Sequence, residues 1–249
     1  MPWWRTWTYA YFGSRITRKS SSNPAGSARM FIYSWRYSSH TSGELHGNLV
    51  ATYESAGIRR FALGRVDCIR AASPEVLNWA KAMCQGDPES QTTNQQNSGP
   101  DEGTKRVQFT IYSQERIKEL FDLAVQRQTK EMTDNITGQG IDNHLMGLRY
   151  TAKEVGEPIP ELFTNQAYEI INHFSLSTSQ VTTKNDAIVG YGPVVPDGYG
   201  CAYNIRNNGI IFSVSAFHSD GRTNATRFAR TLEQSLRDMS AMLKQAGQR

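Results

Sequence analysis

The spacing of hydrophobic residues along the chain changes near residue 174. Before it, apolar residues recur every three or four positions, as in amphipathic helices, which predicts helices over residues 45–64, 73–83, 114–135, 142–155 and 160–171. After it, the period falls to two, which predicts strands over residues 174–181, 187–191, 200–205 and 209–217. A closing amphipathic helix is predicted to begin near Asn224. Helices followed by strands and a final helix indicate an α/β fold with a mixed sheet rather than a barrel.

Two segments follow neither period. Residues 1–43 are rich in aromatic residues and serine, with six basic residues and no acidic one. We expect a divergent, disordered basic leader there, with an organelle transit peptide as the alternative. Residues 85–106, approximately, are polar and aperiodic, which predicts a surface loop or a disordered insertion. The folded domain is therefore expected to cover residues 44–249.

Charge and cysteine content narrow the class of protein. The chain has 27 Lys and Arg against 23 Asp and Glu, and because six of the bases lie in the leader, the remainder is slightly acidic. This balance disfavours nucleic acid as a partner. No apolar run approaches the ~20 residues that a membrane span needs. The three cysteines have no metal-binding spacing, so we expect free thiols, no metal and a cytoplasmic location, with an organelle as the minor alternative.

The strand predicted over residues 174–181 ends in three consecutive hydroxyl residues. Alone, this triplet would indicate an ordinary serine- and threonine-rich edge strand. Its neighbours carry more information, because STSQV at residues 177–181 is followed by YGPVVPDGYG at residues 191–200 and preceded by TYESAGIRRFALGRVD at residues 52–67. Together, and in this order, the motifs closely resemble those of the choline/carnitine acyltransferase family, from about Leu45 to the C-terminus. The resemblance implies the carboxyl-terminal, chloramphenicol-acetyltransferase-like domain of that two-domain fold.

The resemblance also implies a reaction, the transfer of an acyl group from coenzyme A to the hydroxyl of a quaternary-ammonium alcohol. By resemblance, Ser179 is the hydroxyl that faces the developing oxyanion, and losing such a donor typically costs about 10²–10³ in turnover. Ser177 and Thr178 are expected to line the same wall as part of the substrate site. The alternative for these residues is a structural one, in which their hydroxyls satisfy the strand backbone.

Further positions match the family's ligand contacts. Tyr191 lies where the family places an aromatic ring against the trimethylammonium group, a contact that suits a cation over a π face. Gln180 and Arg59 correspond to residues that contact the coenzyme A arm and its phosphate, and Arg suits phosphate because it binds in a bidentate manner. Acetyl-coenzyme A is the expected co-substrate, with no covalently bound cofactor.

Two positions bear on the choice between choline and carnitine, which differ by a carboxylate. In the family's carnitine enzymes an Arg and a Thr hold that carboxylate, and the corresponding residues here are Asn143 and Val66. Burying a carboxylate without a cation is costly, so these residues disfavour carnitine and resemble the choline enzymes. Tyr53 and Ser55 are expected as polar neighbours in the same pocket. Choline is therefore the expected substrate, with carnitine as the alternative.

The catalytic general base is the part that the sequence does not supply. The family's base is a His within a His-Ala-Pro-type segment of the amino-terminal half, and none of the five histidines has that context: His40, His46, His144, His173 and His218. We therefore expect a carboxyl-terminal half that is inactive alone, because the amino-terminal half with the base is missing. A non-catalytic half-domain product is the alternative.

Overall fold

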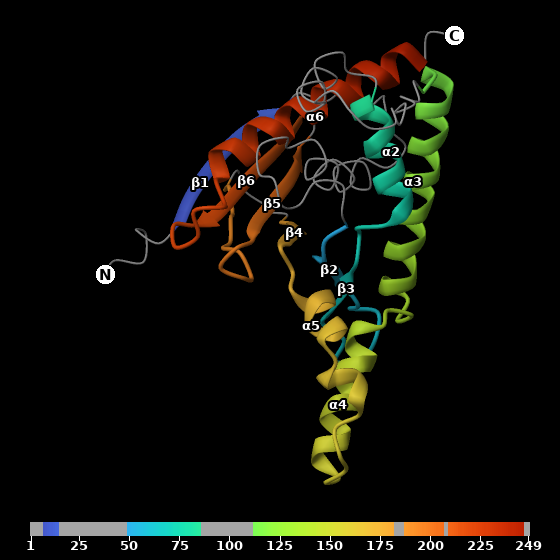
Figure 1. Cartoon of the computed structure of the whole chain (residues 1–249), viewed down its shortest axis with the longest axis vertical. Coiled ribbons are helices and arrows are strands. Elements are labelled where there is room, and N and C mark those ends of the chain that lie inside the picture. Colours follow the sequence, from blue (N-terminus) through green and yellow to red (C-terminus); the bar gives the residue numbers. More distant parts are fainter. Residues whose placement is uncertain (1–6, 15–48, 86–111, 182–186, 207–208, 247–249) are drawn as a thin grey trace, which may run out of the picture.

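The structure is a computed structural model that describes residues 7–14, 49–85, 112–181, 187–206 and 209–246. Its helices and strands are arranged as a mixed α/β fold in which a sheet is packed against long helices (Figure 1). The strands are β1 (Trp7–Ser14), β2 (Thr52–Gly57), β3 (Val66–Ile69), β4 (Leu176–Gln180), β5 (Tyr199–Arg206) and β6 (Gly209–Phe217). The helices are α2 (Pro74–Gln85), α3 (Gln114–Ile136), α4 (Asp142–Glu154), the short 3₁₀ helix η4 (Glu161–Thr164), α5 (Gln166–Asn172) and α6 (Ala225–Ala246).

The six described strands form one sheet in the order β1-β6-β5-β4-β2-β3. The central pairs β2–β4 and β4–β5 are parallel, whereas β1–β6, β5–β6 and β2–β3 are antiparallel. A mixed sheet of this kind confirms the predicted fold class. Its parallel centre brings β2 and β4 side by side although about 120 residues separate them in sequence, and these are the strands that carry the motifs TYES and STSQ.

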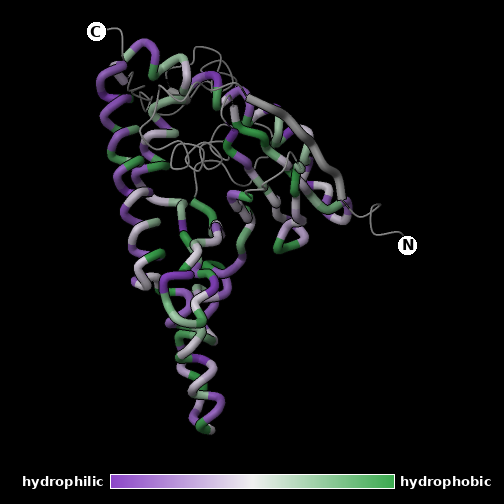
Figure 2. Tube along the Cα trace, turned by 180° about the vertical axis from the view of Figure 1, so that it is seen from behind, coloured by the Kyte–Doolittle hydropathy of each residue, from purple (hydrophilic) through white to green (hydrophobic). Residues whose placement is uncertain are grey.

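The core lies between one face of the sheet and the helices α2, α3 and α6. In α6, Phe228, Leu232, Leu236 and Met239 are fully buried against this core. Hydrophilic residues alternate with hydrophobic ones along α3, as expected for a helix with one buried face (Figure 2). By contrast α4 and α5 have no buried residue, and they extend away from the sheet at the lower end of the molecule (Figure 1).

Most predicted helices are confirmed, but three expectations need correction. Residues 45–64 were expected to be a helix, whereas Thr52–Gly57 is strand β2 with alternating burial. The strand expected at 187–191 is an irregular segment. The helix expected over 160–171 is divided into η4 and α5, because Asn165 is extended and its side chain accepts a hydrogen bond from the Ala167 N–H at 2.8 Å, which starts a new helix.

The leader also differs in part from expectation. Within it, Trp7–Ser14 forms β1, which pairs along its whole length with β6 from Trp7–Phe217 to Ser14–Ile210. Disorder is therefore wrong for these eight residues, since backbone hydrogen bonding to a sheet edge fixes them. The other residues of the leader and the polar segment near 85–106 lie outside the described residues, apart from Gln85, which ends α2. The domain boundary at residue 43 stays a prediction.

Candidate active site

The Ser179 hydroxyl lies at the carboxyl end of β4, next to β2. The parallel ladder pairs Tyr53 with Ser177 and Glu54 with Thr178. One residue further along, the hydroxyls of Ser55 and Ser179 meet at an O–O distance of 3.0 Å. Ser179 is half-buried. A serine on a strand in this setting can donate a hydrogen bond to an oxygen that gains negative charge.

Thr178 does not share that wall, and the expectation that it does is wrong. Successive side chains of a strand point to opposite faces, so Thr178 faces the helical core while Ser177 and Ser179 face the other way. Thr178 is fully buried and donates to the Glu54 carboxylate at 2.9 Å. Tyr203 donates to the other oxygen of that carboxylate at 2.7 Å. Glu54 thus ties together three neighbouring strands, β2, β4 and β5, directly behind the Ser55–Ser179 pair.

Tyr191 belongs to an irregular segment that crosses the face carrying Ser177. Its hydroxyl donates to the carbonyl oxygens of Ser177 at 3.3 Å and Cys201 at 3.1 Å. The segment lies very close to β5, because a Cβ on Gly200 would be 2.8 Å from the Tyr191 carbonyl oxygen. Tyr191 is therefore held by its hydroxyl over the junction of β4 and β5, and it remains half-buried.

A pocket of about 360 Å³ brings together three of the predicted substrate residues, Tyr53, Val66 and Asn143. The Asn143 side chain donates to the Val66 carbonyl oxygen at 2.9 Å, and its backbone N–H donates to the Asp67 carboxylate at 3.3 Å. Val66 and Asn143 are therefore in contact, and their predicted role in the choice of substrate stays a prediction. Neither Ser179 nor Tyr191 lines this pocket.

Arg70 fixes α4 beside this pocket. Its guanidinium binds both oxygens of Asp142, at 3.0 and 2.6 Å, and also donates to Asn172 at 2.9 Å. It lies 5.1 Å from the centre of the Phe174 ring. Burial acts to lower the pKa of Arg70, but the hydrogen bond and charge of Asp142 outweigh it and raise the pKa. This ion pair joins the end of β3 to the start of α4, so it places Asn143 over Val66.

Burial and negative charge act on the titratable groups of the pocket wall. Burial raises the pKa of Tyr53, and the charges of Cys68, Asp67 and Asp142 raise it further. Burial also raises the pKa of the Cys68 thiol to about 12. Both groups are therefore neutral near pH 7, and Cys68 is a poor nucleophile in the folded protein.

Gln180 and Arg59, the predicted coenzyme A contacts, are both exposed. Gln180 ends β4, and Arg59 lies in the turn between β2 and β3 rather than on a helix. Both residues thus lie at or beyond the carboxyl ends of two adjacent parallel strands, and their contact with coenzyme A stays a prediction. Among the described residues, no group of three or more His, Cys, Asp or Glu is arranged to hold a metal ion.

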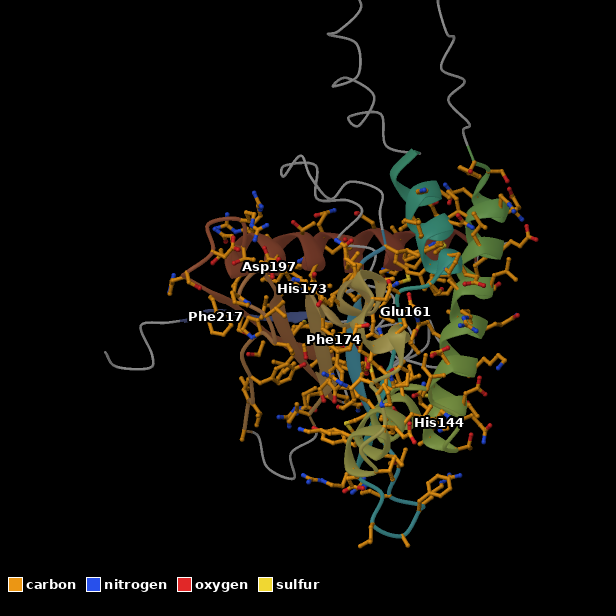
Figure 3. The ribbon with its side chains drawn as sticks, turned by 60° about the horizontal axis from the view of Figure 1, so that its bottom comes forward. His144, Glu161, His173, Phe174, Asp197 and Phe217 are labelled. Carbon is orange, nitrogen blue, oxygen red and sulfur yellow. The ribbon has the colours of Figure 1, made fainter. Side chains whose placement is uncertain are left out.

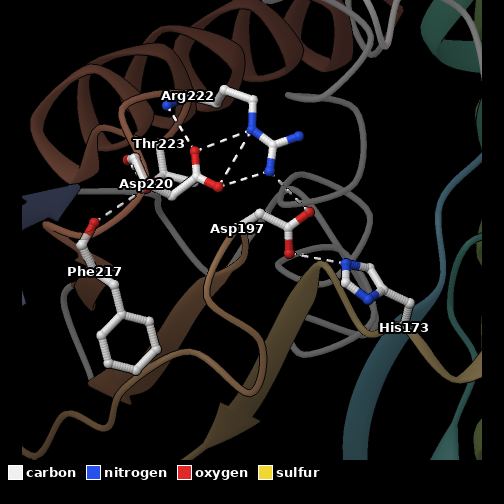
Figure 4. Close-up of polar contacts among 6 residues, drawn as sticks. All are labelled: His173, Asp197, Phe217, Asp220, Arg222 and Thr223. Carbon is white, nitrogen blue, oxygen red and sulfur yellow. Dashed lines mark hydrogen bonds and ion pairs between the residues drawn. The ribbon is translucent and has the colours of Figure 1, made fainter.

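Ser55 is the hydrogen-bond partner of Ser179, and no histidine in the described ranges shares in that contact. His173, before the start of β4, pairs with Asp197 at 2.8 Å, and Arg222 reaches the other oxygen of Asp197 at 3.6 Å (Figure 4). His144 lies on α4, apart from that cluster (Figure 3). His40 and His46 are outside the described residues.

Sequence reasoning missed several groups that shape the site. Glu54 lies within the recognised TYES motif, yet one of its hydrogen-bond donors is Tyr203, which is 149 residues away. Phe174 and Tyr168 enter the pocket from the segment before β4, and nothing in their local sequence indicates that role. The alternation of β4, by contrast, was a usable signal that Thr178 and Ser179 point to opposite faces.

Comparison with known proteins defines the class of this fold and site. The sequence profile described as Choline/Carnitine o-acyltransferase matches residues 5–234. The chain is 50% identical over 201 residues to choline O-acetyltransferase of Drosophila melanogaster and 43% identical over 205 residues to that of Sus scrofa, covering 81% and 82% of this chain. It is also 37% identical over 236 residues, 95% of the chain, to human carnitine O-acetyltransferase. The chain belongs to the choline/carnitine acyltransferase family.

The match covers only part of the length of these relatives. It spans only 28% of the Drosophila and Sus scrofa proteins and 33% of the human one. The family profile begins to match at residue 5, so it includes most of the segment that was expected to be a divergent leader without family resemblance. Together with the pairing of β1 to β6, this argues against an unrelated leader. No helix in the described ranges has the length and hydrophobicity to cross a bilayer.

Proposed function

We propose that this chain provides the oxyanion-binding and alcohol-binding side of an acyltransferase that moves an acetyl group from acetyl-coenzyme A to choline. The observation that carries the proposal is the half-buried Ser179 hydroxyl, oriented by Ser55 at 3.0 Å. In acyl transfer the thioester oxygen gains negative charge, and a fixed hydroxyl donor stabilises it without reorganisation. The relatives named choline O-acetyltransferase support the choice of reaction.

Val66 and Asn143 support choline as the acceptor over carnitine. The Asn143 amide is committed to the Val66 carbonyl oxygen, and Val66 offers no hydrogen-bond donor from its side chain. A carboxylate at this place would have neither a cation nor a hydroxyl from these two residues, at a cost of several kcal/mol if it were buried. The match to carnitine acetyltransferases makes carnitine the second candidate.

The proton acceptor in this proposal is supplied by polypeptide outside the chain. No described histidine contacts Ser179, and the relatives extend well beyond the matched region. A general base contributes about 10²–10⁴ to the rate, and correct positioning of two substrates contributes more. The chain alone is therefore proposed to be inactive. The alternative proposal, from the same observation, is that the chain is a non-catalytic half-domain product.

Turnover of choline and acetyl-coenzyme A, followed by thiol release, tests the proposal. The purified chain should give no rate above background, and a chimera that joins it to the preceding part of the Drosophila relative should be active. In the chimera, Ser179→Ala should lower kcat by about 10²–10³, whereas Ser235→Ala on α6 should leave it unchanged. An active chimera that tolerates Ser179→Ala would refute the role of Ser179. Turnover by the chain alone that depends on His144 or His173 would refute the external base.

A further inference from the structure

Two buried oxygen atoms face each other where the end of α3 approaches β3. Asn135, in the last turn of α3, is 2% exposed, and its Oδ1 has no hydrogen-bond partner within the described residues. The side chain of Asp67, on β3, is also buried, at 5% exposure. A Cβ on Gly140 would be 2.4 Å from Asn135 Oδ1 and 2.4 Å from Asp67 Oδ2, so both oxygens point to the same side of this glycine. Two buried acceptors placed in this way repel each other unless a donor or a cation lies beside them.

The contacts of the Asn135 amide decide which of its atoms faces Asp67. Its Nδ2 donates to the backbone carbonyl oxygen of Glu131 at 2.9 Å and lies 3.5 Å from the Glu131 carboxylate. Turning the amide over would place its oxygen against these two acceptors, so the amide nitrogen belongs on the Glu131 side. The oxygen of Asn135 is therefore held toward Asp67, and the amide does not supply a donor to that carboxylate.

The negative charge of Asp67 is not balanced by a side chain. Its Oδ1 accepts backbone N–H groups from Cys68 and Asn143 at 2.8 and 3.3 Å, and within the described residues it forms no ion pair. Arg70, just after β3, is paired with a different carboxylate. Burial, followed by negative charges that include Asp67, raises the pKa of Tyr53 and of Cys68. Neutral hydrogen bonds stabilise a carboxylate but leave its charge, which favours a cation nearby.

We infer that the side-chain oxygens of Asp67 and Asn135 bind a monovalent metal cation, Na⁺ or K⁺, beside Gly140. Carboxylate and amide oxygens are the ligands that hard cations prefer, and a single carboxylate balances one positive charge. Asp67 also lines the pocket of about 360 Å³, which gives the ion a path from solvent and water for its remaining ligand positions. The cation joins the end of α3 to β3. The expectation of no metal rested on cysteine spacing, which this site does not use, and the inference does not depend on the proposed acyl transfer.

Thermal unfolding of the purified full chain in three chloride salts of equal ionic strength tests the site. NaCl or KCl should raise Tm by about 2–5 °C relative to N-methyl-D-glucamine chloride, whose bulky cation does not fit beside a glycine. Asn135→Leu, which removes the amide oxygen, and Asp67→Asn, which removes the charge, should each abolish this difference. Gly140→Ala should also abolish it, because the methyl would stand 2.4 Å from both oxygens. The matched control is Gly147→Ala on α4, where a methyl points into open space and the difference between salts should persist.

Asn135→Asp adds a second carboxylate and tests the site by a gain of binding. Without metal cations this variant should be less stable than wild type, because the two carboxylates repel, and CaCl₂ should raise its Tm by more than that of wild type. Broadening of the ²³Na NMR line by wild type, reversed by KCl and absent with Asn135→Leu, reports binding without relying on stability. If wild type has the same Tm in all three chlorides and does not broaden the line, a water molecule bridges the two oxygens and the inference is wrong. If the difference between salts persists in Asn135→Leu and Asp67→Asn, the cations act elsewhere and the inference is overturned.

Discussion

The buried contact between Glu54 and two hydroxyl donors gives a stability prediction that can be worked from the structure. Thr178 and Tyr203 are 0% and 1% exposed, and they donate to the two oxygens of a carboxylate that is itself 0% exposed. A hydrogen bond to a charged group contributes about 1.5–3 kcal/mol, and more is at risk when the acceptor is left buried. Thr178→Val and Tyr203→Phe keep the shape of each side chain. Each should therefore lower the free energy of unfolding by about 1.5–3 kcal/mol.

Urea unfolding at pH 7, followed by circular dichroism, measures the loss. Tyr150→Phe is the control, because this tyrosine is 63% exposed and its change should stay within about 0.5 kcal/mol. The double substitution of Thr178 and Tyr203 should depart from additivity, since both hydroxyls serve one carboxylate. If each single variant loses less than about 0.5 kcal/mol at an unchanged m-value, Glu54 does not tie the three strands together and the reasoning fails.

Four other predictions concern Ser55, the Val66–Asn143 pair and Cys68. Ser55→Ala in the active chimera should lower kcat by about 2- to 10-fold, because Ser179 loses the hydroxyl that orients it; an unchanged kcat would contradict this. Val66→Thr with Asn143→Arg should shift the ratio of kcat/KM from choline toward carnitine. Unchanged selectivity would show that the pocket lined by these two residues does not recognise the carboxylate of carnitine. Cys68 should resist alkylation at pH 8 until urea is added, as judged by mass spectrometry. Since the pKa of Cys68 is raised to about 12, the unfolded thiol loses its proton first, so wild type should lose stability relative to Cys68→Ala as pH rises above about 9.

The sequence predicted α3 and α6 well because their buried faces are made largely of apolar residues. In α3, the stripe Ile117, Leu120, Phe121 and Ala124 is buried as its spacing indicates. Strand β2 was missed for the opposite reason. Its buried positions are Thr52, Glu54 and Ala56, which are polar or small, so no apolar alternation marks the strand. β2 pairs with β3 and β4, and Tyr203 donates a hydrogen bond to Glu54; local sequence shows neither.

The site was predictable where it depended on motifs and unpredictable where it depended on distant packing. The resemblance assigned Val66 and Asn143 to one substrate site; the structure joins them by a hydrogen bond of 2.9 Å, and their role in substrate choice stays a prediction. It did not indicate that Phe174 and Tyr168 share their pocket, since the segment that carries these rings is held there by contacts of Arg70 with Asn172 and with the Phe174 ring. Ion pairs between residues 72 positions apart leave no local pattern.

Side chains alternate between the two faces of a strand, so adjacent residues of the same motif have different roles. One stabilises the fold from the core face, and its neighbour lies on the face that carries the candidate site. Glu54 and Thr178 face the core and hold β2, β4 and β5 together, while Ser55 and Ser179, one position further on, meet on the opposite face. A substitution at Thr178 can therefore reduce activity by loosening the strand that carries Ser179, without Thr178 touching any ligand. A loss of activity on substitution of Thr178 or Ser179 therefore identifies a ligand contact only when the free energy of unfolding of the same variant is also measured. A true contact at Ser179 lowers kcat at constant stability, whereas the effect of Thr178→Val should follow the loss of stability.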